Sequence, residues 1–469
     1  MASFPQPEAT MSLDAILIAA HDAAVPIEIV VEGEYAAWLA AQDETTRAQL
    51  TAQRFEGKRY TQALRFDANG RLAGAVVGVR ASNDVWALGN AALTLPPQAY
   101  TLGSALPAGA QQRLALGFAL GAYQFLRYKP KAARPLASLV LEPEAERVAI
   151  ARIAAAVHGA RDLVNTPTED LGPEQLENVI AELAARHGAE FHSIAGEALL
   201  AQNFPAIHAV GRASHRAPRL VELNWGNPAH PRVAILGKGV CFDTGGLDIK
   251  PSDGMALMKK DMGGSAVAIH LASLVMAAGL PVRLQLLVAA VENAIGPNAY
   301  RPGEVIATRA GISVEIGNTD AEGRVILCDA LTYASESEPE LILDFATLTG
   351  AARIALGPDL PPLFSNREEL SLDLVAAGRE AGDPLWAMPL WEDYYSLLDS
   401  KIADLNNSGG SRMAGCITAA LYLKRFVPDR IPWAHLDTYC WSDGKPGRPA
   451  GGDCQGLRAA FAYLEERYG

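Results

Sequence analysis

The sequence contains few cysteines and no long apolar run. Its five cysteines form no CxxC pair, which argues against a disulfide framework and favours a reducing compartment. No stretch of about 18 uncharged apolar residues occurs, and residues 1–17 lack a basic region ahead of an apolar segment. We therefore expect a cytoplasmic protein with neither an export signal nor a membrane span.

The motifs of several common enzyme classes are also missing. There is no GxSxG nucleophile turn, no HExxH zinc helix and no GxxxxGK[ST] phosphate loop. The nine histidines show no ligand spacing, and Cys241 has no histidine near it in the sequence, so we interpret this cysteine as a small packed residue. Catalysis would have to come from carboxylates, cations and metal ions.

Positive charge is in deficit, with 40 Lys and Arg against 53 Asp and Glu. The net charge of -13 argues against nucleic acid or an anionic membrane as the partner and favours small neutral or cationic substrates. Residues 1–150 are nearly neutral, with 13 basic and 14 acidic side chains. The acidic excess therefore lies in residues 151–469.

The length of 469 residues predicts two or three domains, and 49% apolar residues suffice for large cores. Strand-like and helical segments alternate throughout, with DANG at 67–70 as a hairpin turn and one helical segment over 34–55. We predict an α/β fold, with a small N-terminal α/β domain over 1–150 and a larger C-terminal α/β domain over 151–469. The larger domain would contain a mixed sheet covered by helices on both faces.

Charged residues follow three predicted strands of the larger domain, which end near 237, 317 and 346. Ligands bind beyond the carboxyl ends of strands in such sheets, so we expect three adjacent strand ends to share one crevice. Four carboxylates would meet there and would require divalent cations such as Mg²⁺, Mn²⁺ or Zn²⁺. These residues are Asp243, Asp261, Asp320 and Glu322.

Each of these residues also has an ordinary structural interpretation. Asp261 could cap the N-terminus of the next helix. Asp320 and Glu322 could lie in the first turn of another helix, where the helix dipole favours acidic side chains. Lys238, Lys250 and Arg324 could be solvated surface cations. The metal hypothesis depends on all of them converging.

Three segments carry a family resemblance: NTDAEGR at Asn318–Arg324, GKGVCFDTGGLDIKP at 237–251 and KKDMGG at 259–264. Together they closely resemble the leucyl aminopeptidase family of dinuclear metallo-exopeptidases. The resemblance extends from about residue 161 to 427 and more loosely to the C-terminus. Residues 1–150 show no segment that we can align, so the role of the N-terminal domain is unassigned.

The resemblance implies two divalent metal ions per subunit, Zn²⁺ or Mn²⁺ with Mg²⁺ possible, and a bound bicarbonate that acts as general base. Lys250 and Arg324 match the two catalytic cations, and Arg324 would hold the bicarbonate. The implied metal ligands are Lys238, Asp243, Asp261, Asp320 and Glu322, with Asp243 and Glu322 between the ions. A lysine ligates metal only as the neutral amine, so the metal would have to lower the pKa of Lys238 from the usual value of about 10.4.

The resemblance also implies peptide substrates, a preference for leucine-like first residues and a cytoplasmic homohexamer. Substrate contacts carried over from the family are Met258, Asn318, Thr347, Leu348 and Gly350. Met258 lies in the amphipathic segment MALMKK, where packing in the core is an equally common role. Cys416, Cys440 and Cys454 have no role that the sequence indicates.

Two other functions remain open. A di-metal phosphoesterase would use similar carboxylates, although a lysine ligand and the NTDAEGR spacing argue against it. A DNA-binding regulatory or recombination accessory protein would use the N-terminal domain, where basic residues cluster at 54–59 and 129–134. Neither the metal in each site nor the peptide specificity follows from the sequence.

Overall fold

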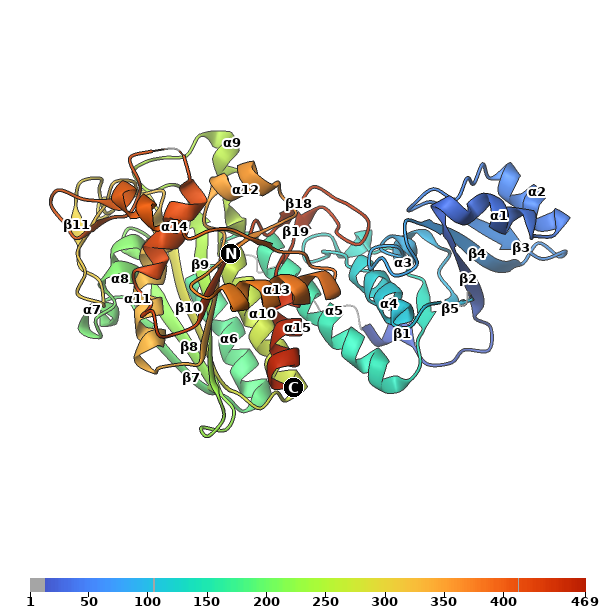
Figure 1. The fold of residues 1–469 in the computed structure, drawn as a ribbon, viewed down its shortest axis with the longest axis horizontal. Coiled ribbons are helices and arrows are strands. Elements are labelled where there is room, and N and C mark those ends of the chain that lie inside the picture. The colour runs from blue at the N-terminus through green and yellow to red at the C-terminus, as the bar shows by residue number, and fades with distance from the viewer. Residues whose placement is uncertain (1–12, 104–105, 412) are drawn as a thin grey trace. The chain divides into compact units, whose positions relative to one another are not determined.

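The computed structural model describes residues 13–103, 106–411 and 413–469, which form two compact units (Figure 1). The first unit contains residues up to His158 together with Ser442–Ala450, and the second contains Gly159–Trp441 and Gly451–Gly469. The helix α5 (Glu144–Asn165) belongs to both units, and the boundary predicted at residue 150 falls inside it. The prediction that the chain has no export signal was based on residues 1–17, and most of these residues lie outside the described part of the structure.

The first unit is built on a mixed six-stranded sheet in the order β1-β6-β5-β2-β4-β3. Its strands and helices are β1 (Leu17–Ile18), β2 (Val25–Val31), β3 (Gln62–Phe66), β4 (Leu72–Val79), β5 (Ala99–Leu102), β6 (Ser138–Val140), α1 (Tyr35–Ala40), α2 (Glu44–Ala52), α3 (Ala91–Thr94) and α4 (Ala110–Gly121). Three short 3-10 helices accompany them: η1 (Leu13–Ala15), η2 (Glu32–Glu34) and η3 (Pro130–Ala132).

Local sequence explains one correct and one incorrect prediction in this unit. The DANG segment is a hairpin turn between antiparallel β3 and β4, in which Asp67 accepts hydrogen bonds from the backbone of Asn69 and Arg71. The single helical segment predicted over 34–55 is wrong, because it divides into α1 and α2. Asp43 accepts a hydrogen bond from Thr46 N at 2.7 Å and so caps a new helix inside that segment.

The second unit contains an eight-stranded mixed sheet in the order β15-β14-β17-β13-β9-β10-β8-β7. The four central strands, β17, β13, β9 and β10, are parallel, whereas β14, β8 and β7 join antiparallel neighbours. The strands are β7 (Glu190–Ala195), β8 (Arg219–Trp225), β9 (Arg232–Asp243), β10 (Arg283–Asn293), β13 (Leu341–Ala346), β14 (Pro362–Ser365), β15 (Trp386–Ala387) and β17 (Trp433–Asp437). This mixed α/β architecture confirms the predicted fold class.

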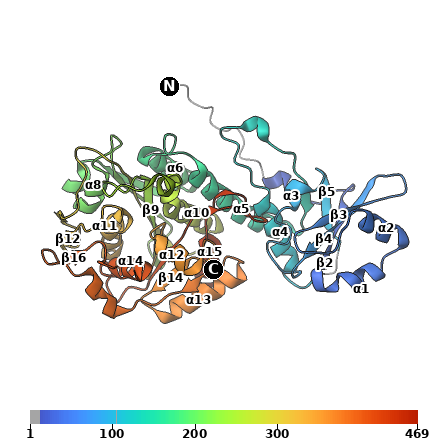
Figure 2. The same cartoon turned by 90° about the horizontal axis from the view of Figure 1, so that it is seen from above.

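Helices cover both faces of this sheet (Figure 2). Even-numbered residues of β9, such as Leu236, share a buried cluster with α8 (Pro205–Gly211), α11 (Glu322–Glu336) and α14 (Gly415–Lys424). On the opposite face Gly237 lies directly against α10 (Gly263–Ala278). Because side chains alternate along a strand, this register aims Lys238 toward α11. The remaining helices are α6 (Pro173–His187), α7 (Ala198–Ala201), α9 (Ser252–Met255), α12 (Gly350–Leu356), α13 (Glu368–Glu380), α15 (Leu457–Tyr468), η4 (Met258–Met262) and η5 (Glu392–Leu398).

The strand predicted at 313–317 is not part of the main sheet. It is the two-residue β12 (Val314–Glu315), which pairs with β11 (Val305–Ile306) and β16 (Leu405–Asn406) in a separate three-stranded sheet. A second small sheet joins β18 (Trp441–Ser442) to β19 (Gly451–Gly452). The expectation of three adjacent strand ends is therefore wrong, since only β9 and β13 are neighbours.

One helical segment, Met258–Ala278, is long and apolar enough to cross a membrane by length and composition. It combines η4 with α10, and 78% of its most apolar window is buried inside the structure. The small residues at its start bring it against the sheet, because a Cβ atom at Gly264 would lie 2.1 Å from the carbonyl oxygen of Phe345 in β13. Such burial is that of a core helix.

Gly264→Ala should therefore destabilise the protein, although alanine is the better helix former by about 1 kcal/mol. The added methyl group meets backbone that cannot rotate away, so we expect a loss of about 2 kcal/mol or more in the free energy of unfolding. Gly254→Ala in α9 is the matched control, because its Cβ would make only ordinary contacts at 3.5 Å or more. Chemical denaturation of both variants measures the difference, and equal stabilities would contradict the packing described for α10.

Candidate metal and active site

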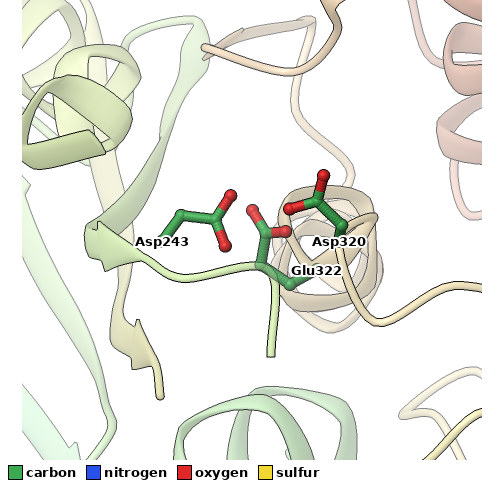
Figure 3. A group of neighbouring side chains, drawn as sticks. All are labelled: Asp243, Asp320 and Glu322. Atoms are coloured by element: carbon green, nitrogen blue, oxygen red, sulfur yellow. The ribbon is translucent and has the colours of Figure 1, made fainter. Parts of the chain in front are cut away.

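The predicted site residues converge, but from different elements than expected. Lys238 lies within β9, which continues to Asp243 as its last residue. Asp320 precedes α11, and Glu322 is the first residue of that helix. In Figure 3 the carboxylates of Asp243, Asp320 and Glu322 point toward one another, and one ligand atom from each lies within 4.8 Å of the others. The three carboxylates therefore form a compact candidate metal group.

Lys238 is the centre of the buried part of this cluster. Its ammonium lies 2.7 Å from Asp261 Oδ2 and 2.8 Å from Glu322 Oε1, and it donates to the carbonyl oxygen of Thr347 at 2.8 Å. Its side chain is only 3% exposed. Asp261 belongs to η4 and does not cap α10, whose N-cap position is Met262. The interpretation of Lys238 as a surface cation and of Asp261 as a helix cap is therefore excluded.

Lys250 likewise pairs with two carboxylates, on the other side of the cluster. Its ammonium lies 2.8 Å from Asp243 Oδ2 and pairs with Asp320. The second oxygen of Asp243 accepts hydrogen bonds at 2.8 Å from Gly245 N and from Asn293 Nδ2. Asn293 at the end of β10 is a residue that the sequence analysis missed, because its role depends on the pairing of β10 with β9.

The pKa values of the clustered side chains show the effect of burial and of neighbouring negative charges. Burial raises the pKa of Asp261 to about 8, and burial together with Asp243 and Glu322 raises that of Asp320 to about 7. Burial alone would lower the pKa of Lys238, but the charges of Asp261 and Glu322 outweigh it and raise that pKa. The two lysines do not suffice to keep every carboxylate ionised at neutral pH, so further positive charge fits here.

The oxygen atoms of the cluster fit divalent cations. Among the residues that the structure describes, Glu322 Oε2 is buried and has no hydrogen-bond partner. Asp261 Oδ2 and Asp320 Oδ1 also lack a hydrogen bond with good geometry and contact only the lysine ammonium groups. Buried carboxylate oxygens without donors are costly, and hard cations satisfy them. Lys238 could join such a site only after losing its proton.

Arg324 is buried in the first turn of α11 and is held by a residue from a distant loop. One of its terminal nitrogens donates to the carbonyl oxygen of Asn407 at 2.9 Å, whereas its Nε is buried with no partner among the described residues. The Asn407 side chain accepts from Gly317 N and donates to the carbonyl oxygen of Asn318. Asn407 thus fixes the turn before the acidic residues, a role that the sequence did not predict.

Asn318 shapes that same turn. Its side-chain oxygen accepts from Asp320 N at 2.8 Å, and Asn318 is absent from the described residues that line the cavity. The structure thus brings together the predicted metal ligands, Lys250 and four of the five predicted substrate contacts, and leaves Asn318 and Arg324 outside the cavity wall.

A cavity of about 140 Å³ opens over the cluster. Met258, Thr347, Leu348 and Gly350 line it, as expected for substrate contacts. Asp437 at the end of β17 supports this wall, since its carboxylate accepts hydrogen bonds from Leu348 N, Thr349 N and Thr349 Oγ1. Lining residues that the sequence analysis missed include Lys260, Arg353, Asp437 and Tyr439.

All five cysteines are buried free thiols. Burial raises the pKa of Cys241 well above its usual range, which agrees with its interpretation as a packed residue. Burial also raises the pKa of the Cys416, Cys440 and Cys454 thiols.

Comparisons with known proteins bear on this site. The family model described as "Cytosol aminopeptidase family, catalytic domain" matches residues 158–460, and "M17 aminopeptidase, N-terminal domain" matches residues 25–142. The chain belongs to the cytosol aminopeptidase family. The resemblance stated from the three motifs is thereby confirmed, and it extends into the N-terminal domain, where the sequence alone showed nothing to align.

Relatives and solved structures agree with this assignment. A probable cytosol aminopeptidase of Syntrophotalea carbinolica is 42% identical over 386 residues, 77% of each chain. The crystal structure of cytosol aminopeptidase from Coxiella burnetii matches with a TM-score of 0.93 and 46% identity over 97% of this chain and 100% of that one. The bottromycin maturation enzyme BotP, solved in complex with Mn, matches with a TM-score of 0.85 and 32% identity over 95% and 99%. This chain is therefore an aminopeptidase, a hydrolase of the metallo-exopeptidase class.

Gly323→Ala should impair this site without unfolding it. A Cβ atom at Gly323 would lie 2.6 to 2.7 Å from the last atoms of the Lys238 side chain, which three partners hold in place. Displacing that ammonium separates it from Asp261 and Glu322, so we expect aminopeptidase activity to fall by about tenfold or more. Activity and thermal melting should be measured together. Full activity at an unchanged melting temperature would show that the position of Lys238 is unimportant.

Metal binding should strengthen as the pH rises from about 6 to above 8. Asp261 and Asp320 have raised pKa values of about 8 and about 7, so below those values they carry protons that a cation must displace. Calorimetric titration of the metal-free protein with Mn²⁺ in two buffers of different ionisation enthalpy counts the released protons. We expect at least one proton per protein at pH 7, and an affinity that does not change with pH would contradict the crowding of charge described here.

Proposed function

We propose that the chain removes N-terminal residues from peptides with the help of two divalent metal ions held by Lys238, Asp243, Asp261, Asp320 and Glu322. The observation that carries this proposal is the buried, unpartnered oxygen of Glu322 within a cluster of carboxylates whose pKa values are raised. When bound, two such ions would lower the pKa of a water molecule and polarise the scissile carbonyl. The metals are Zn²⁺ or Mn²⁺, with Mg²⁺ as a further candidate, and the Mn complex of BotP supports manganese.

Lys250 would stabilise the oxyanion that forms at the attacked carbonyl. In the structure its ammonium pairs with Asp243 and Asp320 at the edge of the cavity. When cations neutralise those carboxylates, the ammonium becomes available to a substrate oxygen. A single donor of this kind is worth about 3 to 4 kcal/mol of transition-state stabilisation.

Arg324 cannot act as a base, because a guanidinium does not lose its proton at neutral pH. Its buried Nε without a partner is suited to hold a small anion, and bicarbonate would then accept protons during the reaction. Met258, Thr347, Leu348 and Gly350 would form the wall around the first residue of the peptide.

The relatives named cytosol aminopeptidases support a cytoplasmic location. A homohexamer stays a prediction from the resemblance. The preference for a leucine-like first residue stays a prediction from the resemblance. No observation favours a phosphoesterase or a DNA-binding protein, and the N-terminal domain stays without an assigned role.

Asp320→Ala tests the metal site. The substitution removes a carboxylate from the group formed with Asp243 and Glu322, so we expect hydrolysis of aminoacyl anilides to fall by about 10³-fold. Treating the wild type with a chelator should abolish activity, and adding Mn²⁺ or Zn²⁺ should restore it. The exposed Asp373 of α13 offers the control Asp373→Ala, which should retain wild-type activity. Comparable rates for Asp320→Ala and wild type would overturn the assignment.

A further inference from the structure

The cavity contains a second pair of cations that the proposed metal site does not use. Lys260 belongs to η4 and is only 5% exposed, and its ammonium lies 4.8 Å from the centre of the Tyr439 ring. The guanidinium carbon of Arg353 in α12 lies 4.4 Å from the same ring centre. Lys260, Arg353 and Tyr439 all line the cavity over the metal cluster. The ring thus brings two positive charges to one part of its wall.

Lys260 differs from the other two lysines of the cavity because its ammonium makes no ion pair with a described carboxylate, although the neighbouring Asp261 attracts it. Lys238 and Lys250 each contact two carboxylates. Within the described part of the chain, the Lys260 ammonium makes neither an ion pair nor a hydrogen bond. Its contact with an aromatic ring is worth about 0.5 to 2 kcal/mol, which is less than the several kcal/mol that burying a charge costs.

Among the described residues that line the cavity, the one other acid, Asp437, already accepts hydrogen bonds. Its two oxygens accept hydrogen bonds from the backbone of Leu348 and from the backbone and hydroxyl of Thr349. The metal-site carboxylates are likewise committed to the two lysines or, in the proposed enzyme, to the metal ions. These acids therefore offer no ion pair to Lys260, and Arg353 is exposed, so an anion that enters the cavity from solution can contact both cations.

We propose that Lys260 and Arg353 bind the side-chain carboxylate of the first residue of the peptide, so that the enzyme favours substrates that begin with Glu or Asp. This inference rests on the proposed function and replaces the leucine-like preference that the family resemblance implies. Lys260 is adjacent in sequence to Asp261 and lines the same cavity as Met258, Thr347 and Gly350. A cation beside the metal cluster is at a fixed distance from the first residue, whereas the distance to a peptide's C-terminal carboxylate varies with its length.

The test compares kcat/KM for glutamyl and leucyl p-nitroanilides, neither of which has a C-terminal carboxylate, on the metal-loaded enzyme. Wild type should favour the glutamyl substrate. Lys260→Met and Arg353→Met should each lower the ratio of glutamyl to leucyl kcat/KM by about 10- to 100-fold, as expected for a lost hydrogen bond to a charged group. Lys259→Met is the matched control with an unchanged ratio, because the Lys259 ammonium donates to the carbonyl oxygen of Asn165 at 2.7 Å and does not line the cavity.

Four outcomes would overturn the inference, and one of them also concerns the proposed function. If wild type favours the leucyl substrate, or if Lys260→Met and Lys259→Met have the same ratio, the cations do not select the first residue. If Lys260→Met and Arg353→Met instead weaken cleavage of leucyl-glycine but not of leucyl-glycinamide, the cations bind the C-terminal carboxylate of the peptide and the inference is wrong. If wild type loaded with Mn²⁺ or Zn²⁺ cleaves neither anilide, the proposed function fails as well.

Discussion

The repulsion between buried carboxylates is the constraint on which the second unit depends. Asp243, Asp261 and Glu322 are almost fully buried, and Asp320 lies beside them. Such a group is stable only with positive charge at contact distance. Lys238 and Lys250 each contact two of these acids, so each lysine offsets charge that comes from two different segments. The lysines therefore connect η4, β9 and the start of α11 as well as neutralising them.

The backbone around the cluster is arranged to allow this close approach. Gly323 leaves room for the Lys238 side chain against α11, and Gly264 lets α10 lie on the backbone of β13. Side chains at either position would separate elements that must stay within hydrogen-bond distance of the cluster. Polar residues then fix the turns: Asp437 holds the wall that begins at Thr347, and Asn407 holds the turn before Asp320. Packing and electrostatics thus impose the same geometry.

The sequence predicted the parts of this arrangement that depend on local order. Strands followed by acidic and basic residues predicted the convergence of the carboxylates, and the turn at 67–70 identified a hairpin. The position of β12 was mispredicted because its partners β11 and β16 pair only in the tertiary structure. Asn407 acts 89 residues away from Asn318, and no spacing in the sequence indicates such a contact. The break between α1 and α2 was missed because helical composition continues through Asp43, whose capping side chain begins a new helix.

The cavity contains one group of acidic residues and one separate pair of cations, and the net charge of the chain does not reveal this division. In the proposed enzyme, the acids beside Lys238 and Lys250 would hold the metal ions. Lys260 and Arg353 share one ring and form no ion pair with a described carboxylate, so metal ions bound nearby would increase the positive potential around them and with it the attraction for an anion. An acidic chain can thereby present a positively charged pocket once its metals are bound. Under the proposal, Lys260 and Arg353, which form no ion pair with a described acid, would then select the first residue of the substrate.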